Sequence, residues 1–147
     1  MSFSGVSYPA IVTAAVLAWL AGALWYGVLA KSWVAAQGLT MEEFKAKQAA
    51  IKGSPGAYML YVIAFVAELV MAWALAGVLG HLGPGQVTLH NGVISALFLW
   101  FGFVVTTLAV NYAFGGRSLK LYLIDIGHWL LVLLIIGVVI GGFGVAP

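Results

Sequence analysis

A single acidic side chain lies inside a long apolar stretch of the sequence. Glu68 is surrounded by fourteen uncharged residues in IAFVAELVMAWALAG, residues 63–77. A second acid, Asp125, precedes His128 by three residues, a spacing that puts both side chains on one face of a helix. Carboxyl and imidazole groups embedded in apolar helices are typical of proton relays and ion pathways. The chemistry that these residue types support is therefore the binding or transfer of a proton or a cation.

The composition predicts that lipid surrounds these groups. Hydrophobic residues make up 64% of the 147 residues and charged residues 7%, whereas about 25% are charged in typical soluble domains. Four apolar stretches, roughly 8–30, 57–80, 92–114 and 119–143, reach the length of about 20 residues that a membrane-spanning helix needs. A transmembrane barrel would show alternating segments of about ten residues instead. We predict an all-α membrane protein, a single domain over residues 1–147 with four transmembrane helices in an antiparallel bundle.

The basic residues predict the orientation of this bundle. All six lie in or beside the first and third connections between the apolar stretches: Lys31, Lys45, Lys47, Lys52, Arg117 and Lys120. The positive-inside rule places these connections in the cytoplasm and both termini on the outer side. We expect the first helix to be retained, because no positive charge precedes it as in a signal peptide. Topology accounts for the basic residues, so we expect no nucleic-acid partner.

The first connection contains the signature of a short helix over about residues 40–52. Thr40 and Glu43 have the spacing of a capping box, and Gly53 can end the helix. Phe44 and Ile51 share one side of this helix and lysines the other, which predicts an amphipathic helix on the cytoplasmic lipid headgroups. A helix that docks the chain on a larger membrane complex through Thr40–Lys52 would have the same pattern.

Counting helical turns places several polar residues at similar depths. Glu68 lies eleven residues after the start of its helix and His128 nine after the start of its own, so at about 1.5 Å per residue both approach the bilayer midplane. The predicted polar seam comprises Glu68, Asp125, His128, Asn111, Thr106 and Thr107. An ionised side chain at this depth costs roughly 2.5–3.5 kcal/mol, so we predict that Glu68 and His128 share a proton. The competing interpretation is that the seam only joins the helices by hydrogen bonds.

Small residues recur every four positions, as helices that pack closely in lipid require. The stripes are Ala10, Ala14, Ala18 and Gly22 in the first helix, Ala64, Ala72, Ala76 and Gly80 around Glu68 in the second, and Gly137 and Gly141 in the fourth. Four helices enclose little space, so we expect the first and fourth stripes to be available to another copy of the chain.

The first functional hypothesis is therefore a non-enzymatic, self-associating bundle in the lipid bilayer. The alternative is a small transporter or channel that handles protons or cations through the seam. The sequence shows no nucleophile with a base at helical spacing and no motif for a metal or a phosphate group. We expect neither an enzymatic activity, nor a metal, nor a cofactor.

Aromatic residues gather where the helices should meet the headgroups, and we interpret them as interfacial anchors. They are Tyr8, Trp25, Tyr26, Trp33, Tyr58, Tyr61, Tyr112 and Tyr122. Two segments that end inward-running helices also match each other: WYGVLAKS at 25–32 and NYAFGGRS at 111–118 share Tyr and Ser and have Lys opposite Arg. This match hints at two related hairpins.

Two further segments carry a family resemblance: ALWYGVLAKSW at 23–33, and the run from FGGRS to GGF at 114–143. They resemble a bacterial membrane family catalogued as domain of unknown function 1761. Its pattern is W-Y, then G-K-x-W, F-x-G-R, and a last helix with L-I-x-x-G and a later Gly. The matching positions here are Trp25, Tyr26, Lys31, Trp33, Phe114, Gly116, Arg117, Leu123, Ile124, Gly127 and Gly137. The resemblance implies a four-helix protein of the bacterial inner membrane and supplies no activity, substrate or cofactor. His128 and Glu68 depart from the pattern, which looks aromatic at the first position and small or apolar at the second.

Overall fold

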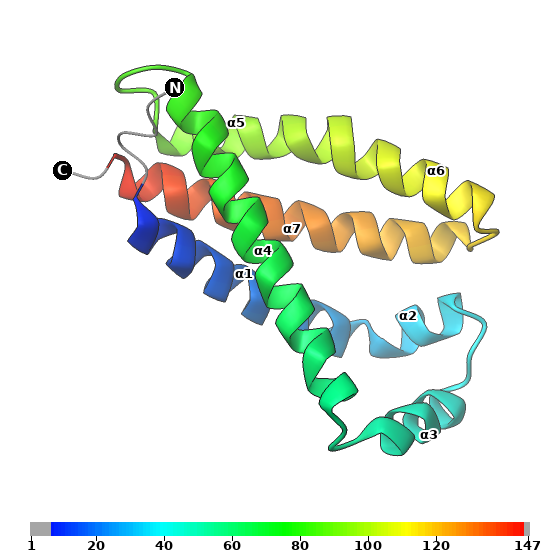
Figure 1. Ribbon diagram of the computed structural model, residues 1–147. Helices are drawn as coiled ribbons and strands as arrows, with labels where there is room; N and C mark the ends of the chain where they lie inside the picture. The colour runs from blue at the N-terminus through cyan, green and yellow to red at the C-terminus, as the bar shows by residue number, and fades with distance from the viewer. Residues whose placement is uncertain (1–6, 146–147) are drawn as a thin grey trace.

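The structure is a computed structural model in which residues 7–145 are described. Every regular element in this part of the chain is a helix (Figure 1). In chain order they are α1 (Tyr8–Val28), α2 (Ala30–Ala36), α3 (Met41–Ile51), α4 (Pro55–His81), α5 (Leu89–Leu99), the π-helix η1 (Trp100–Val105), α6 (Thr106–Phe114) and α7 (Leu119–Phe143). Four spans are long and apolar enough to cross a membrane, namely α1, α4, the continuous run α5–η1–α6, and α7. The predicted all-α, four-span architecture is confirmed.

The helix bounds agree with the predicted segments to within about three residues, and two larger features differ. The fourth helix has the predicted ends, residues 119–143. The first span ends at Val28, and after Leu29 the chain continues as α2 to Ala36, beyond the predicted end at residue 30. The third span is not a uniform α-helix, because η1 interrupts it. A π-helix adds a residue per turn and therefore rotates the side chains that follow it relative to an α-helix.

Hydroxyl side chains cap most helix starts by accepting a backbone N–H, as N-cap residues do. The pairs are Ser7 with Ala10, Thr40 with Glu43, Ser54 with Ala57, Thr88 with Asn91, and Ser118 with Leu121. At α3 the predicted capping box is present, since the Thr40 N–H also donates to the Glu43 carboxylate at 2.8 Å. This backbone hydrogen bond lowers the pKa of the exposed Glu43 below its ordinary value.

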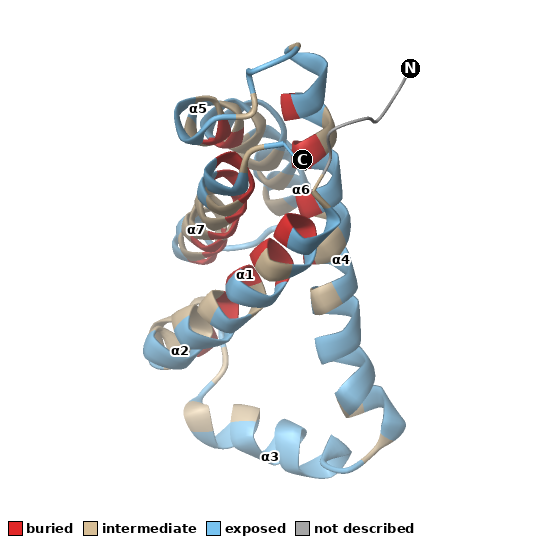
Figure 2. Cartoon of the chain, turned by 90° about the vertical axis from the view of Figure 1, so that its left-hand side faces the viewer, coloured by how far each residue is buried: buried red, intermediate tan, exposed pale blue. Residues whose placement is uncertain are grey.

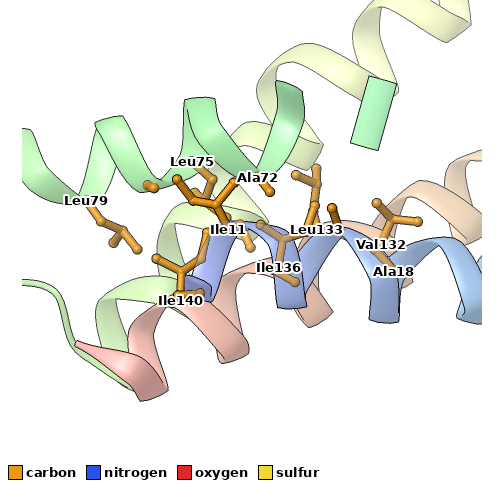
Figure 3. Close-up of a cluster of buried hydrophobic side chains, with 14 residues drawn as sticks. Ile11, Ala18, Ala72, Leu75, Leu79, Val132, Leu133, Ile136 and Ile140 are labelled. Atoms are coloured by element: carbon orange, nitrogen blue, oxygen red, sulfur yellow. The ribbon is translucent and has the colours of Figure 1, made fainter. Parts of the chain in front are cut away.

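Helix α7 lies at the centre of the bundle, with α1 and α5 along it, and the second half of α4 crosses them (Figures 1 and 2). The core between these helices is aliphatic, and Leu75, Leu79, Val132 and Ile136 are its large fully enclosed side chains (Figure 3). In the first half of α4, residues 55–67, no residue is buried. This half diverges from the bundle towards α3 (Figure 2).

The small-residue stripes pack inside the chain. Ala10, Ala14 and Ala18 are fully buried in the core. A Cβ on Gly137 would overlap the backbone of Gly92, and one on Gly141 would overlap the backbone of Thr88. The expectation that these stripes are available to another copy is wrong, because the close approach that small residues permit is already used between helices of one chain.

Candidate functional site

Asp125 is the centre of a hydrogen-bonded group that joins three helices. It lies in α7 with only 8% of its surface exposed. The Tyr26 hydroxyl of α1 donates to Oδ1 at 2.8 Å, and the Tyr112 hydroxyl of α6 donates to Oδ2. Hydrogen bonds from hydroxyl groups to a carboxylate are short and strong. Each carboxyl oxygen is thus held by one tyrosine, and the carboxyl group has a fixed orientation.

The two tyrosines were interpreted from the sequence as interfacial anchors, and their bonds to Asp125 were missed. A signal for them was present. Tyr26 and Tyr112 occupy the same position in the matched segments 25–32 and 111–118. Two helix-ending segments that carry the same residue at the same position can present it to one partner between them.

A cavity of about 440 Å³ adjoins this group, at the end of the molecule where α2, α6 and the start of α7 lie. Polar and aromatic side chains dominate its lining, which consists of Trp33, Gln37, Asn111, Tyr112, Gly115, Arg117, Leu121 and Asp125. Asn111, predicted at the depth of Asp125, does share this cavity with it. Arg117 and Trp33, two residues of the family pattern that are far apart in the sequence, both line this cavity.

Glu68 and His128 converge on Gly22. Their exposed fractions are 3% and 5%, although both side chains are polar. A Cβ on Gly22 would lie 2.8 Å from His128 Nε2 and 3.7 Å from Glu68 Oε1, so the glycine makes room for both. Glu68 Oε2 and His128 Nδ1 are buried without a hydrogen-bond partner. Among the described residues no hydrogen bond joins Glu68 to His128, and the shared proton stays a prediction.

Tyr26 connects the two groups. Its hydroxyl binds Asp125, and its ring contacts the His128 imidazole with centroids 4.7 Å apart. Trp129 contacts the imidazole as well, at 4.8 Å. Asp125, Tyr26, His128 and Glu68 therefore form a series from the cavity into the interior of the bundle. Its first three members are in direct contact, and its last two both lie near Gly22.

Thr106 and Thr107, also predicted in the seam, lie apart from this series. Both are exposed, and the Thr106 hydroxyl donates to the Gly102 carbonyl of its own helical run at 2.8 Å. The sequence prediction compared only the depths of these residues, and depth does not determine which side of a helix faces α7.

The π-helix itself is attached to α7 at both ends. The Trp100 indole N–H donates to the Ile126 carbonyl at 2.8 Å, and the Tyr122 hydroxyl donates to the Val105 carbonyl at 3.1 Å. The second bond gives the Val105 carbonyl of η1 a donor from α7, whereas the first uses a carbonyl of α7 itself.

The other residues of the family pattern have varied surroundings. The Trp25 ring packs on Gly127, where a Cβ would lie 3.0 Å from it, and its indole N–H is buried without a partner. Gly116 has the positive φ of 61° in the turn before α7. Lys31 and Phe114 are exposed.

In the part of the chain that the structure describes, no group of three or more His, Cys, Asp or Glu side chains could hold a metal ion.

Comparison with known proteins gives one match. A family model described as a protein of unknown function, DUF1761, matches residues 9–141. No curated protein and no solved structure matches the chain. The description of the family names no activity, so a functional assignment has to come from the geometry of the site.

Proposed function

We propose that this chain, which belongs to the DUF1761 family of proteins of unknown function, handles protons or small cations in the membrane. The observation that carries the proposal is the pair of buried atoms without partners, Glu68 Oε2 and His128 Nδ1, on two helices that meet at Gly22. Ionisable residues inside membrane spans are costly and mark ion or proton pathways by default. Groups that only joined helices would have their hydrogen bonds satisfied.

The arrangement of the series suits stepwise transfer. Asp125 faces the cavity and can exchange a proton or bind a cation there. His128 is one helical turn further along α7, and an imidazole can accept a proton at one nitrogen while releasing one from the other. Glu68 is the innermost acid and the end of the series. By the positive-inside rule the cavity opens to the cytoplasm, with the termini on the outer side of a bacterial inner membrane.

Proteoliposomes test this proposal. We expect the protein to acidify vesicles under an inward proton gradient, or to pass a monovalent cation, faster than empty vesicles do. Glu68→Gln keeps the size of the side chain and removes its charge, so we expect it to reduce the flux about tenfold or more. Glu42→Gln on the exposed α3 is the matched control and should keep the wild-type rate. A flux equal to that of empty vesicles, or an unchanged flux in Glu68→Gln, would refute the proposal.

A second candidate function is the non-enzymatic, self-associating bundle. Its support now comes from the first half of α4 instead of the small-residue stripes. Tyr58, Leu60, Tyr61 and Ile63 are all at least half exposed there, so this segment of α4 has apolar surface free for another copy. Single-molecule counting of labelled chains in lipid would show dimers or larger assemblies, and monomers at all lipid dilutions would contradict this candidate.

A further proposal is that the chain docks on a larger membrane complex through Thr40–Lys52. A pull-down with and without that segment would test it.

A further inference from the structure

Two oppositely charged side chains line one cavity. Arg117 and Asp125 both contribute to the lining of the cavity at α2, α6 and α7. Within the described residues no ion pair or hydrogen bond joins them. Opposite charges that share a partly enclosed space attract strongly, and a molecule that contacts both would benefit from both.

Asp125 keeps capacity to bind such a molecule. A carboxylate offers about four acceptor positions, and the tyrosine hydroxyls occupy one on each oxygen. The bonds fix the carboxylate but do not neutralise its charge. An ammonium group in the cavity would find an oriented acceptor. Trp33 belongs to the same lining, and an indole ring attracts cations.

Arg117 supplies the complementary half. A guanidinium group binds a phosphate or carboxylate through two parallel hydrogen bonds. The side-chain amides of Asn111 and Gln37, also in the lining, can donate and accept further hydrogen bonds. The volume of about 440 Å³ falls in the range of small-molecule sites.

We propose that this cavity binds a small zwitterion, with its ammonium group at Asp125 and Trp33 and its phosphate or carboxylate at Arg117. A zwitterion can contact both charged side chains favourably, whereas a simple cation or a simple anion is attracted by only one of them. Two sources share this chemistry: a soluble aminophosphate or amino acid, and the headgroup of an ethanolamine phospholipid, since the cavity lies at the end of the membrane spans. The inference goes beyond the proposed ion handling, and binding can be measured without any flux.

Calorimetric titration of the full chain in detergent tests the soluble source, with phosphoethanolamine as the probe. Ethanolamine and inorganic phosphate, each carrying half of its charge pattern, are the matched ligands. Native mass spectrometry of the chain released from nanodiscs of mixed phosphatidylethanolamine and phosphatidylglycerol tests the lipid source. We expect phosphoethanolamine to bind saturably and at least about tenfold tighter than either half, or phosphatidylethanolamine to be retained selectively.

Arg117→Gln should weaken the observed binding about tenfold, because one charged hydrogen-bonded contact is lost. Lys120→Gln removes an exposed charge three residues away, outside the lining, and should leave binding unchanged. Asp125→Asn gives an independent check on the ammonium side, and Arg117→Gln still decides the question if that variant does not fold. Binding of both half-ligands as tightly as phosphoethanolamine, equal binding in Arg117→Gln, or no binding in either assay would overturn the inference. None of these outcomes depends on proton flux through Glu68.

Discussion

Asp125 is the only aspartate in the chain and one of two acids within its four candidate membrane spans. It is stable there because two tyrosine hydroxyls donate to it, one from α1 and one from α6. Burying a carboxyl group without such donors would cost several kcal/mol of free energy that nothing else would offset. The same bonds join three helices at one point, so the group that faces the cavity is also a structural junction.

Removal of one hydroxyl should therefore destabilise the fold measurably. We expect Tyr26→Phe and Tyr112→Phe each to lower the free energy of unfolding by about 1.5–3 kcal/mol, since each loses a hydrogen bond to a charged group. Denaturant titration in mixed micelles measures this change. Tyr61→Phe, on the exposed half of α4, is the control and should be nearly neutral. Equal stability of the Tyr112→Phe variant and the control would show that the hydroxyl contributes nothing.

Helices α5 and α7 approach each other backbone to backbone. Gly92 and Gly137 face each other so closely that a Cβ on either would overlap the carbonyl of the other. The G-x-x-x-G of the last helix, visible in the sequence, is the cause of this approach. Its partner is α5 of the same chain, and the motif alone could not distinguish that helix from a second copy.

A methyl group at this contact should force the two helices apart. We expect Gly137→Ala to cost about 1–3 kcal/mol of unfolding free energy, as overpacking of a tight core does. Gly142→Ala lies in the same helix with nothing within 4 Å of the added methyl, and should be neutral. The comparison is made by thermal unfolding in detergent. A neutral Gly137→Ala would mean that the interface is looser than the structure indicates.

The sequence predicted where the helices lie along the chain better than which side of each helix contacts its neighbours. Hydropathy and caps were sufficient for the four spans and for α3, because long apolar runs and the Thr40–Glu43 box are local signals. Thr106 and Thr107 were placed in the seam by depth alone, and depth does not determine which face of a helix a residue occupies. The convergence of Glu68 and His128 on Gly22 was predictable as similar depth, but not as contact. Contacts of that kind depend on how α1, α4 and α7 cross, which a single sequence does not determine.

At the scale of the whole molecule, α3 connects α2 to the first half of α4, which diverges from the bundle. Phe44 of α3 packs edge to face on Trp33 of α2, with ring centroids 5.8 Å apart, while the chain after Ile51 turns into the exposed half of α4. Trp33 also lines the cavity. The position of the amphipathic helix is thereby connected to the wall of the candidate site, and both lie on the side that carries the basic residues.

This arrangement predicts which side of the membrane each connection faces. The turn between α4 and α5 contains no basic residue, whereas α3 contains Lys45 and Lys47. The positive-inside rule therefore predicts that α3 lies in the cytoplasm and the α4–α5 turn outside. The chain has no cysteine, so a single introduced thiol reports its own position without background.

Labelling in bacterial cells checks this orientation. We expect a membrane-impermeant maleimide to label Pro84→Cys in intact spheroplasts and to label Gln48→Cys only after permeabilisation. Both positions are exposed, so detergent should make both thiols fully reactive, which controls for accessibility. The reverse pattern would place the cavity and Asp125 on the outer side, and would change the direction from which a proton or a zwitterion reaches them.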